Sequence, residues 1–96
     1  MSKNDLVKLL SELNDEVRNK YRGRIVGLFG SYARGEENEE SDIDILVENG
    51  GDMTLFDLGG LKIFLEEKLN HEVDVATIGG LRKEIKPYIM RDIIYI

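Results

Sequence analysis

The chain has 96 residues, which is enough for one folded domain and too few for two. It has no cysteine and one histidine, so disulfides, thiolate metal sites, thiol nucleophiles and paired-imidazole sites are excluded, and carboxylates remain for chemistry. No apolar run reaches the ~18 residues of a membrane span and no signal peptide is evident. We therefore expect a cytoplasmic protein, and its net charge of -6 argues against direct nucleic-acid binding.

The first predicted helix ends near Tyr21, with Gly23 as its C-terminal stop. Its apolar residues recur at helical spacing, which predicts an amphipathic helix: Leu6, Leu9, Leu10, Leu13 and Val17. The β-rich run from Arg24 to Phe29 then predicts a first strand, and Gly30 closes it.

The next segment predicts a short helix, an exposed loop and a second strand. Ser31 to Arg34 can form one or two helical turns, and the acidic stretch from Gly35 to Glu40 is typical of an exposed loop. Residues 41–47 alternate, so a strand there would place Asp42, Asp44 and Leu46 on one face.

A second amphipathic helix follows the turn at residues 49–52, with Thr54 as a predicted N-cap and Asp57 three residues later. Its expected core stripe is Leu55, Leu58, Leu61, Leu65 and Leu69. Gly59 and Gly60 interrupt this helix, and we expect them to permit close approach to the sheet. Residues 72–77 alternate again and predict a third strand.

The C-terminal region is less regular. Leu81, Ile85 and Ile89 indicate a last helix, but Pro87 forbids an undisturbed interior there. The apolar ending, residues 93–96, predicts a docked edge strand or a contact with a partner in a homo- or hetero-oligomer. Alternating helices and strands predict one α/β (α+β) domain over residues 1–96, with a small mixed sheet of about three to four strands and helices packed on it.

The candidate chemistry lies in paired carboxylates. Asp42 and Asp44 are two residues apart on the second predicted strand, so their Cα atoms should be ~6.6 to 6.8 Å apart on one face. A neighbouring strand would add Asp74 to that face. Carboxylate oxygens suit Mg²⁺, and two such ions would clamp the attacking and leaving oxygens of a phosphoryl or nucleotidyl transfer.

A strand-to-helix turn upstream adds a possible phosphate site. Backbone N–H groups at Gly30 and Ser31, together with the Ser31 hydroxyl, are placed to receive phosphate oxygens. The pattern is not a P-loop, because Glu36 and Glu37 stand where Lys and Ser or Thr are required. Arg34 is the nearest cation, and it can either touch phosphate or pair with the acidic loop at residues 36–40.

These motifs together resemble a known family. Phe29-Gly30-Ser31, then Asp42-Ile43-Asp44-Ile45, then Val73-Asp74-Val75 is similar to the signature of polymerase-β-type nucleotidyltransferases. The string GSYARGEENEESDIDILV is similar to the minimal nucleotidyltransferases of the MNT group, whose members are commonly antitoxin partners of HEPN-domain proteins. The resemblance covers Val26 to Val75, about half of the chain.

The resemblance implies a fold, an activity and residue roles. The fold would be the polymerase-β-type nucleotidyltransferase core. The enzyme would transfer a nucleoside monophosphate, most simply AMP from ATP, to a hydroxyl of a HEPN-type partner protein, with two Mg²⁺ ions. Asp42 and Asp44 would bind the metals, and Asp74 would ligate the second metal or accept the hydroxyl proton. Gly30 and Ser31 would hold the β and γ phosphates, with Arg34 as a further nucleotide contact.

Two other functions are weighed against this one. A non-catalytic antitoxin would occlude its partner and keep the carboxylates only as remnants, although such crowded acids have no evident structural purpose without a cation. A phosphatase of the HAD type also uses a D-x-D motif, but Leu46 stands where that family has Thr or Val. Such a phosphatase would also have no use for Gly30 and Ser31.

Overall fold

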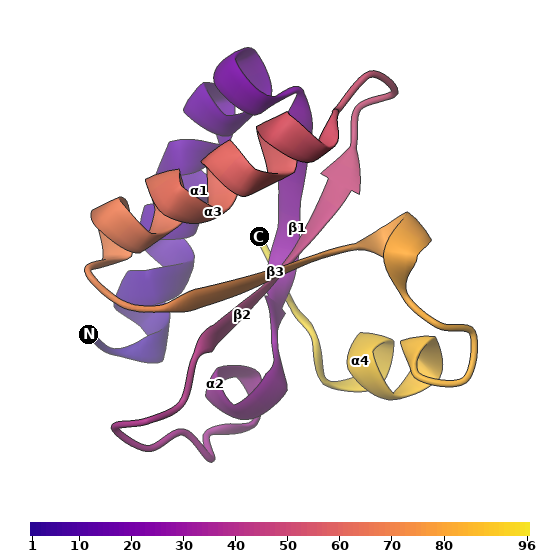
Figure 1. Ribbon diagram of the computed structural model, residues 1–96. Helices are drawn as coiled ribbons and strands as arrows, with labels where there is room; N and C mark the ends of the chain where they lie inside the picture. The colour runs from indigo at the N-terminus through magenta and orange to yellow at the C-terminus, as the bar shows by residue number, and fades with distance from the viewer.

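Two long helices cover one face of a four-stranded mixed sheet in the computed structural model, which describes residues 1–96 (Figure 1). The strands are β1 (Gly23–Phe29), β2 (Ile43–Asn49), β3 (Val73–Thr77) and β4 (Ile94–Tyr95). Their order in the sheet is β3-β2-β1-β4. β1 is antiparallel to β2 and to β4, whereas β2 and β3 are parallel. The predicted fold class is therefore confirmed.

The helices are α1 (Lys3–Tyr21), α2 (Gly30–Arg34), α3 (Leu55–Leu69) and α4 (Lys86–Asp92), with a 3₁₀ turn at Ile78–Gly80. α1 and α3 pack against each other and against the sheet, while α4 packs against α2 and β1 (Figure 1). The core between the sheet and the long helices is aliphatic, and its fully buried members include Leu6, Leu10, Val17, Ile25, Leu28, Ile45, Val47, Leu61 and Leu65.

The end of α1 differs from the prediction. The helix ends at Tyr21 as expected, but the left-handed C-cap residue is Arg22, with φ of 61°, and its N–H donates to the Arg18 carbonyl. Gly23 instead begins β1. A Cβ atom on Gly23 would lie 3.0 Å from the Glu48 carbonyl oxygen and would push aside the flexible end of Met53, so the start of the strand is closely packed here.

A bulge in β1 is held by α1. The register of β1 against β2 shifts between Ile25 and Gly27. Asn14 on α1 accepts a hydrogen bond from the Ile25 N–H at 2.8 Å and donates to the Ile25 carbonyl at 3.1 Å. This one side chain therefore pairs with both backbone groups of Ile25.

The start of α3 confirms the predicted cap and corrects the predicted stripe. Thr54 and Asp57 form a reciprocal capping box. Leu55, however, is 86% exposed, because the core face of the helix begins one turn later. The glycine prediction was also wrong: Gly59 faces open space, and Gly60 approaches the ring of Tyr21 on α1 rather than the sheet.

The C-terminal segment forms a helix and an edge strand. α4 starts at Lys86, so Pro87 lies in its first turn, where a missing N–H costs nothing, and Leu81 lies outside the helix. The chain then turns back, and β4 pairs with β1 at Gly27 and Leu28. The predicted edge strand is confirmed. No helix of this chain is both long enough and apolar enough to span a membrane.

Candidate active site

Two carboxylates lie side by side on neighbouring strands. Asp44 is the second residue of β2, and its register partner on the parallel strand β3 is Asp74. Paired residues on adjacent strands point to the same face of a sheet, with backbones ~4.8 Å apart. Asp44 is half-buried and Asp74 is exposed. The sequence-based expectation that a neighbouring strand places Asp74 beside Asp44 is confirmed.

Asp42 precedes the strand rather than lying in it. β2 begins at Ile43, whose N–H donates to the Glu72 carbonyl at the edge of β3, so Asp42 is the last residue of the connecting loop. Its side chain is exposed, and its charge acts on Asp44. The strand predicted over residues 41–47 in fact lies two residues later at each end, because backbone pairing with β1 and β3 starts only at Ile43 and extends to Asn49.

Gly30 lies directly against the Asp44 carboxylate. Its backbone has φ of 72°, and a Cβ atom at this position would collide with the Asp44 side chain. Phe29, the preceding residue, is the register partner of Asp44 across β1 and β2. Both the left-handed backbone and the contact require glycine here. The turn from β1 into α2 thus presents its backbone to the carboxylate.

The structure places the remaining predicted residues on α2. Ser31 is its second residue and half-buried, beside Gly30. Arg34 is its last residue, and its Nε donates to Glu36 at 3.1 Å in an exposed pair. Its charge also favours the ionised form of the Asp44 carboxyl. Of the two sequence alternatives for Arg34, the structure shows the pairing with the acidic loop, and contact with phosphate stays a prediction.

The electrostatics of Asp44 are unfavourable for its charged form. Burial, together with repulsion from Asp74 and Asp42, raises the pKa of the Asp44 carboxyl to about 6, while Arg34 opposes the change. An acid surrounded by acids keeps its proton more readily. The same crowding would favour a bound cation, which would neutralise the repulsion.

The chemistry of these donors fits a divalent cation. Three carboxylates contribute only oxygen ligands, which is the donor type that Mg²⁺ selects. In this arrangement of side chains no three acidic or imidazole groups already converge on one point. Asp42 and Asp74 are exposed, so they can adopt other rotamers toward Asp44 without repacking the core.

A hollow of about 410 Å³ adjoins Gly30 between α2 and α4. It is lined by Phe29, Gly30, Arg34, Tyr88, Ile89, Arg91 and Asp92. The α4 residues among these were not identified from the sequence as site residues. The sequence signal for them was weak. Tyr88 and Arg91 are three positions apart, which places them on one face of a helix, but the sequence alone did not fix where that helix begins.

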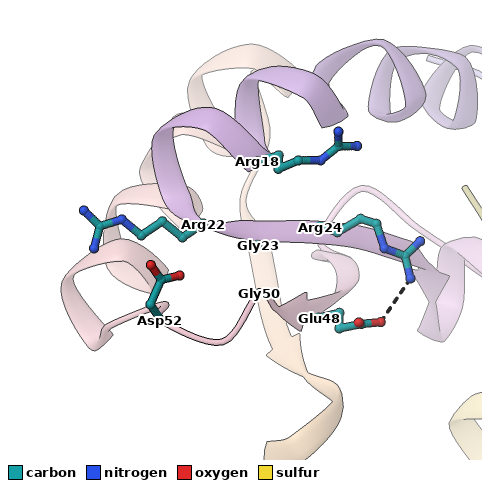
Figure 2. Close-up of a pocket in the computed structure, with 7 residues that line it drawn as sticks. All are labelled: Arg18, Arg22, Gly23, Arg24, Glu48, Gly50 and Asp52. Atoms are coloured by element: carbon teal, nitrogen blue, oxygen red, sulfur yellow. Dashed lines mark hydrogen bonds and ion pairs between the residues drawn. The ribbon is translucent and has the colours of Figure 1, made fainter.

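A second hollow, of about 400 Å³, lies at the other end of the sheet (Figure 2). Its lining includes Gly23, the first residue of β1, whereas Gly30 follows the last residue of that strand. The arginines shown in Figure 2 point in different directions, and Arg24 is paired with Glu48 at 3.0 Å. None of the predicted site residues lines this hollow, so it is separate from the carboxylate site.

Comparison with known proteins agrees with this geometry. A family model described as nucleotidyltransferase domain matches residues 10–96. Protein adenylyltransferase MntA of Thermococcus cleftensis is 33% identical over 92 residues, covering 96% of this chain and 93% of that protein. A solved structure described as a minimal nucleotidyltransferase superposes with a TM-score of 0.84 at 31% identity, covering 100% of this chain and 97% of the other.

A more distant structure shares the fold. The crystal structure of a toxin-antitoxin with AMP-PNP superposes with a TM-score of 0.71 at 23% identity. The match covers 99% of this chain and 72% of that chain. The fold is therefore the one on which a minimal nucleotidyltransferase site is built.

Proposed function

The chain belongs to the nucleotidyltransferase domain family, and from this premise we propose that it transfers AMP from ATP to a side-chain hydroxyl of a partner protein. One observation carries the proposal. The half-buried Asp44 has Asp74 beside it on β3 and the Gly30 turn pressed against its carboxylate. This arrangement supports metal binding and phosphate binding close to one another at Asp44.

Three carboxylates would hold the metal ions. Asp42 and Asp44 would bind Mg²⁺, and Asp74 would ligate a second ion or accept the proton of the acceptor hydroxyl. Bound Mg²⁺ supplies neutralisation of the triphosphate charge, a common requirement of phosphoryl-transfer enzymes. The pairing of β2 with β3 holds the backbones of Asp44 and Asp74 side by side.

The reaction would be an in-line displacement. The acceptor hydroxyl oxygen forms a bond to the α phosphorus of ATP, and the bond from that phosphorus to the pyrophosphate oxygen breaks. The hydroxyl proton leaves to Asp74 or to water, and pyrophosphate departs. Gly30 and Ser31 would hold the β and γ phosphates through the backbone of the turn. Positioning and charge neutralisation would supply most of the rate enhancement.

The proposed acceptor is a HEPN-type partner of a toxin-antitoxin pair. A protein acceptor is supported by the name of the Thermococcus cleftensis relative, protein adenylyltransferase MntA. An antitoxin role is supported by the toxin-antitoxin complex with AMP-PNP that shares this fold. A HEPN partner is what the resemblance of the D-x-D segment to the MNT group implies. The net charge of -6 further disfavours a nucleic-acid acceptor.

Co-expression with the partner separates catalysis from occlusion. The partner would be purified after co-expression with the parent chain or with the Asp42→Asn/Asp44→Asn form, and its intact mass would be measured. We expect an added mass of one or more adenylyl groups with the parent form only. If the partner is neutralised equally well by both forms and its mass never changes, the chain acts by occlusion and the catalytic proposal is wrong.

A further inference from the structure

The hollow between α2 and α4 lies on one defined side of the candidate catalytic carboxylates. The strand order β3-β2-β1-β4 puts Asp74 on one side of Asp44, and Gly30 with the hollow on the other. An in-line displacement requires the attacking and leaving oxygens on opposite sides of the phosphorus. The acceptor hydroxyl can then approach from the Asp74 side, which leaves the hollow for the nucleotide.

The positive charges that line the hollow fit a triphosphate. Arg34 of α2 and Arg91 of α4 both line it, in a chain whose net charge is -6. Guanidinium groups are planar forks that bind phosphate oxygens in pairs. The Arg91 side chain is 70% exposed, and its acidic partner is the adjacent Asp92, at 3.7 Å, so it remains available to a ligand.

The aromatic and acidic side chains of α4 in the same hollow fit a nucleoside. Tyr88 on α4 is 64% exposed, and the Arg91 guanidinium lies 5.5 Å from its ring centre, which leaves the opposite ring face uncovered by that cation. Aromatic faces stack on nucleobases of any sequence. Asp92 also lines the hollow, and its carboxylate can accept hydrogen bonds from ribose hydroxyls or a base amino group. A carboxylate is suited to the sugar end of the nucleotide and not to the phosphate end.

We propose that α4 forms the nucleoside wall of the nucleotide site, with Tyr88 stacking on the base and Arg91 joining Arg34 on the triphosphate. This inference rests on the proposed nucleotidyltransferase function and extends it to residues outside the Val26 to Val75 motif region. The size of the hollow, about 410 Å³, lies within the range of small-molecule sites. It also gives the C-terminal helix, which has no fully buried residue, a role in ligand binding.

Equilibrium binding of two probes tests the two assignments separately. Isothermal titration would compare Mg²⁺-ATP with Mg²⁺-tripolyphosphate, which lacks base and ribose. Tyr88→Ala is expected to weaken ATP binding about 10-fold and to leave tripolyphosphate binding unchanged, because only the base loses its contact. Arg91→Ala is expected to weaken both probes about 10-fold, because a charged phosphate contact is lost. Tyr88→Phe keeps the ring and should bind ATP like the parent.

Matched controls come from the same C-terminal segment. Tyr95 is 61% exposed on β4 and lies outside the hollow, so Tyr95→Ala should bind both probes like the parent. Arg82 is exposed and also lies outside the hollow, so Arg82→Ala should bind both probes like the parent and is the control for Arg91→Ala. If the parent binds ATP and both Tyr88→Ala and Arg91→Ala bind it equally well, the inference about α4 is wrong while the proposed function stands. A parent that binds neither probe overturns the proposed function and the inference together.

Discussion

Asp44 carries an electrostatic cost that a substitution should reveal. Its pKa is raised from 3.8 to about 6 by burial and by the charges of Asp74 and Asp42, so ionisation is more costly in the folded chain than in the unfolded one. The cost is absent below about pH 4, grows between about pH 4 and pH 6, and is fully present above that window. We expect Asp44→Asn to raise the free energy of unfolding of the metal-free protein at pH 7.5 by about 1 kcal/mol, after discounting for solvent screening.

Urea unfolding at several pH values would check this sign. The stability difference between Asp44→Asn and the parent should vanish near pH 4 and reach its maximum above pH 6. A parent chain that is more stable than Asp44→Asn at pH 7.5 without metal would contradict the view that the carboxylates repel one another.

Bound magnesium should offset the electrostatic cost of the ionised Asp44 carboxylate. If Asp42, Asp44 and Asp74 bind Mg²⁺ in the folded chain only, Mg²⁺ at about 100 times its Kd should stabilise the parent by about 2.7 kcal/mol. The Asp44→Asn form, which lacks a central ligand, should gain much less. Thermal unfolding with added Mg²⁺ and then with excess EDTA would measure both effects. An equal rise in Tm for the two forms would place the metal elsewhere.

Gly30 can be tested against a glycine with the same backbone conformation. Gly30 and Gly35 both have φ of 72°, but a Cβ atom at Gly30 meets Asp44, whereas one at Gly35 meets nothing. Gly35→Ala should therefore cost only the left-handed conformation, roughly 1 to 2 kcal/mol. Gly30→Ala should displace the Asp44 carboxylate as well and lower nucleotidyl transfer about 100-fold. Urea unfolding of both variants would measure the backbone strain, and a transfer assay would measure the effect of displacing Asp44. Equal losses of activity in Gly30→Ala and Gly35→Ala would show that Gly30 has no special role.

At the scale of elements, Asn14 joins α1 to the bulge in β1. Asn14→Ala removes two hydrogen bonds to Ile25 and leaves part-buried backbone groups without partners, which should cost about 2 kcal/mol of stability. Asn14→Asp keeps the acceptor for the Ile25 N–H, and at low pH its protonated carboxyl can also donate to the Ile25 carbonyl, so at low pH its cost should be smaller than that of Asn14→Ala. Chemical unfolding of the three forms would measure this order. An Asn14→Ala form as stable as the parent would mean that water replaces the two hydrogen bonds of the side chain.

Sequence patterns predicted the elements whose apolar spacing was regular and missed features set by tertiary contacts. The stripe of α1, the Thr54 cap and the alternation around Asp44 and Asp74 all depend on local chemistry, and each was confirmed. The left-handed Arg22 and the exposed Leu55 depend on what packs beside them, which no local pattern records. For the same reason Tyr88 and Arg91 could not be assigned to the Gly30 site from the sequence, because that assignment depends on the packing of α4 against α2.

At the scale of the whole molecule, the sheet order separates the approaches to the site. β3 carries Asp74 on one side of Asp44, while β1 leads to Gly30 and the hollow under α4 on the other. If the nucleotide occupies this hollow, the acceptor hydroxyl and the nucleotide would reach Asp44 from opposite sides.

Transfer of labelled nucleotide tests the central claim most directly. The purified chain would be incubated with Mg²⁺ and ATP labelled at the α phosphate in extract of its host, beside the Asp42→Asn/Asp44→Asn form. The account predicts label on a discrete protein with the parent only, and none when the label is on the γ phosphate. Equal labelling by both forms, or no label with the parent while the proposed HEPN-type partner is present, would contradict nucleotidyl transfer by these carboxylates.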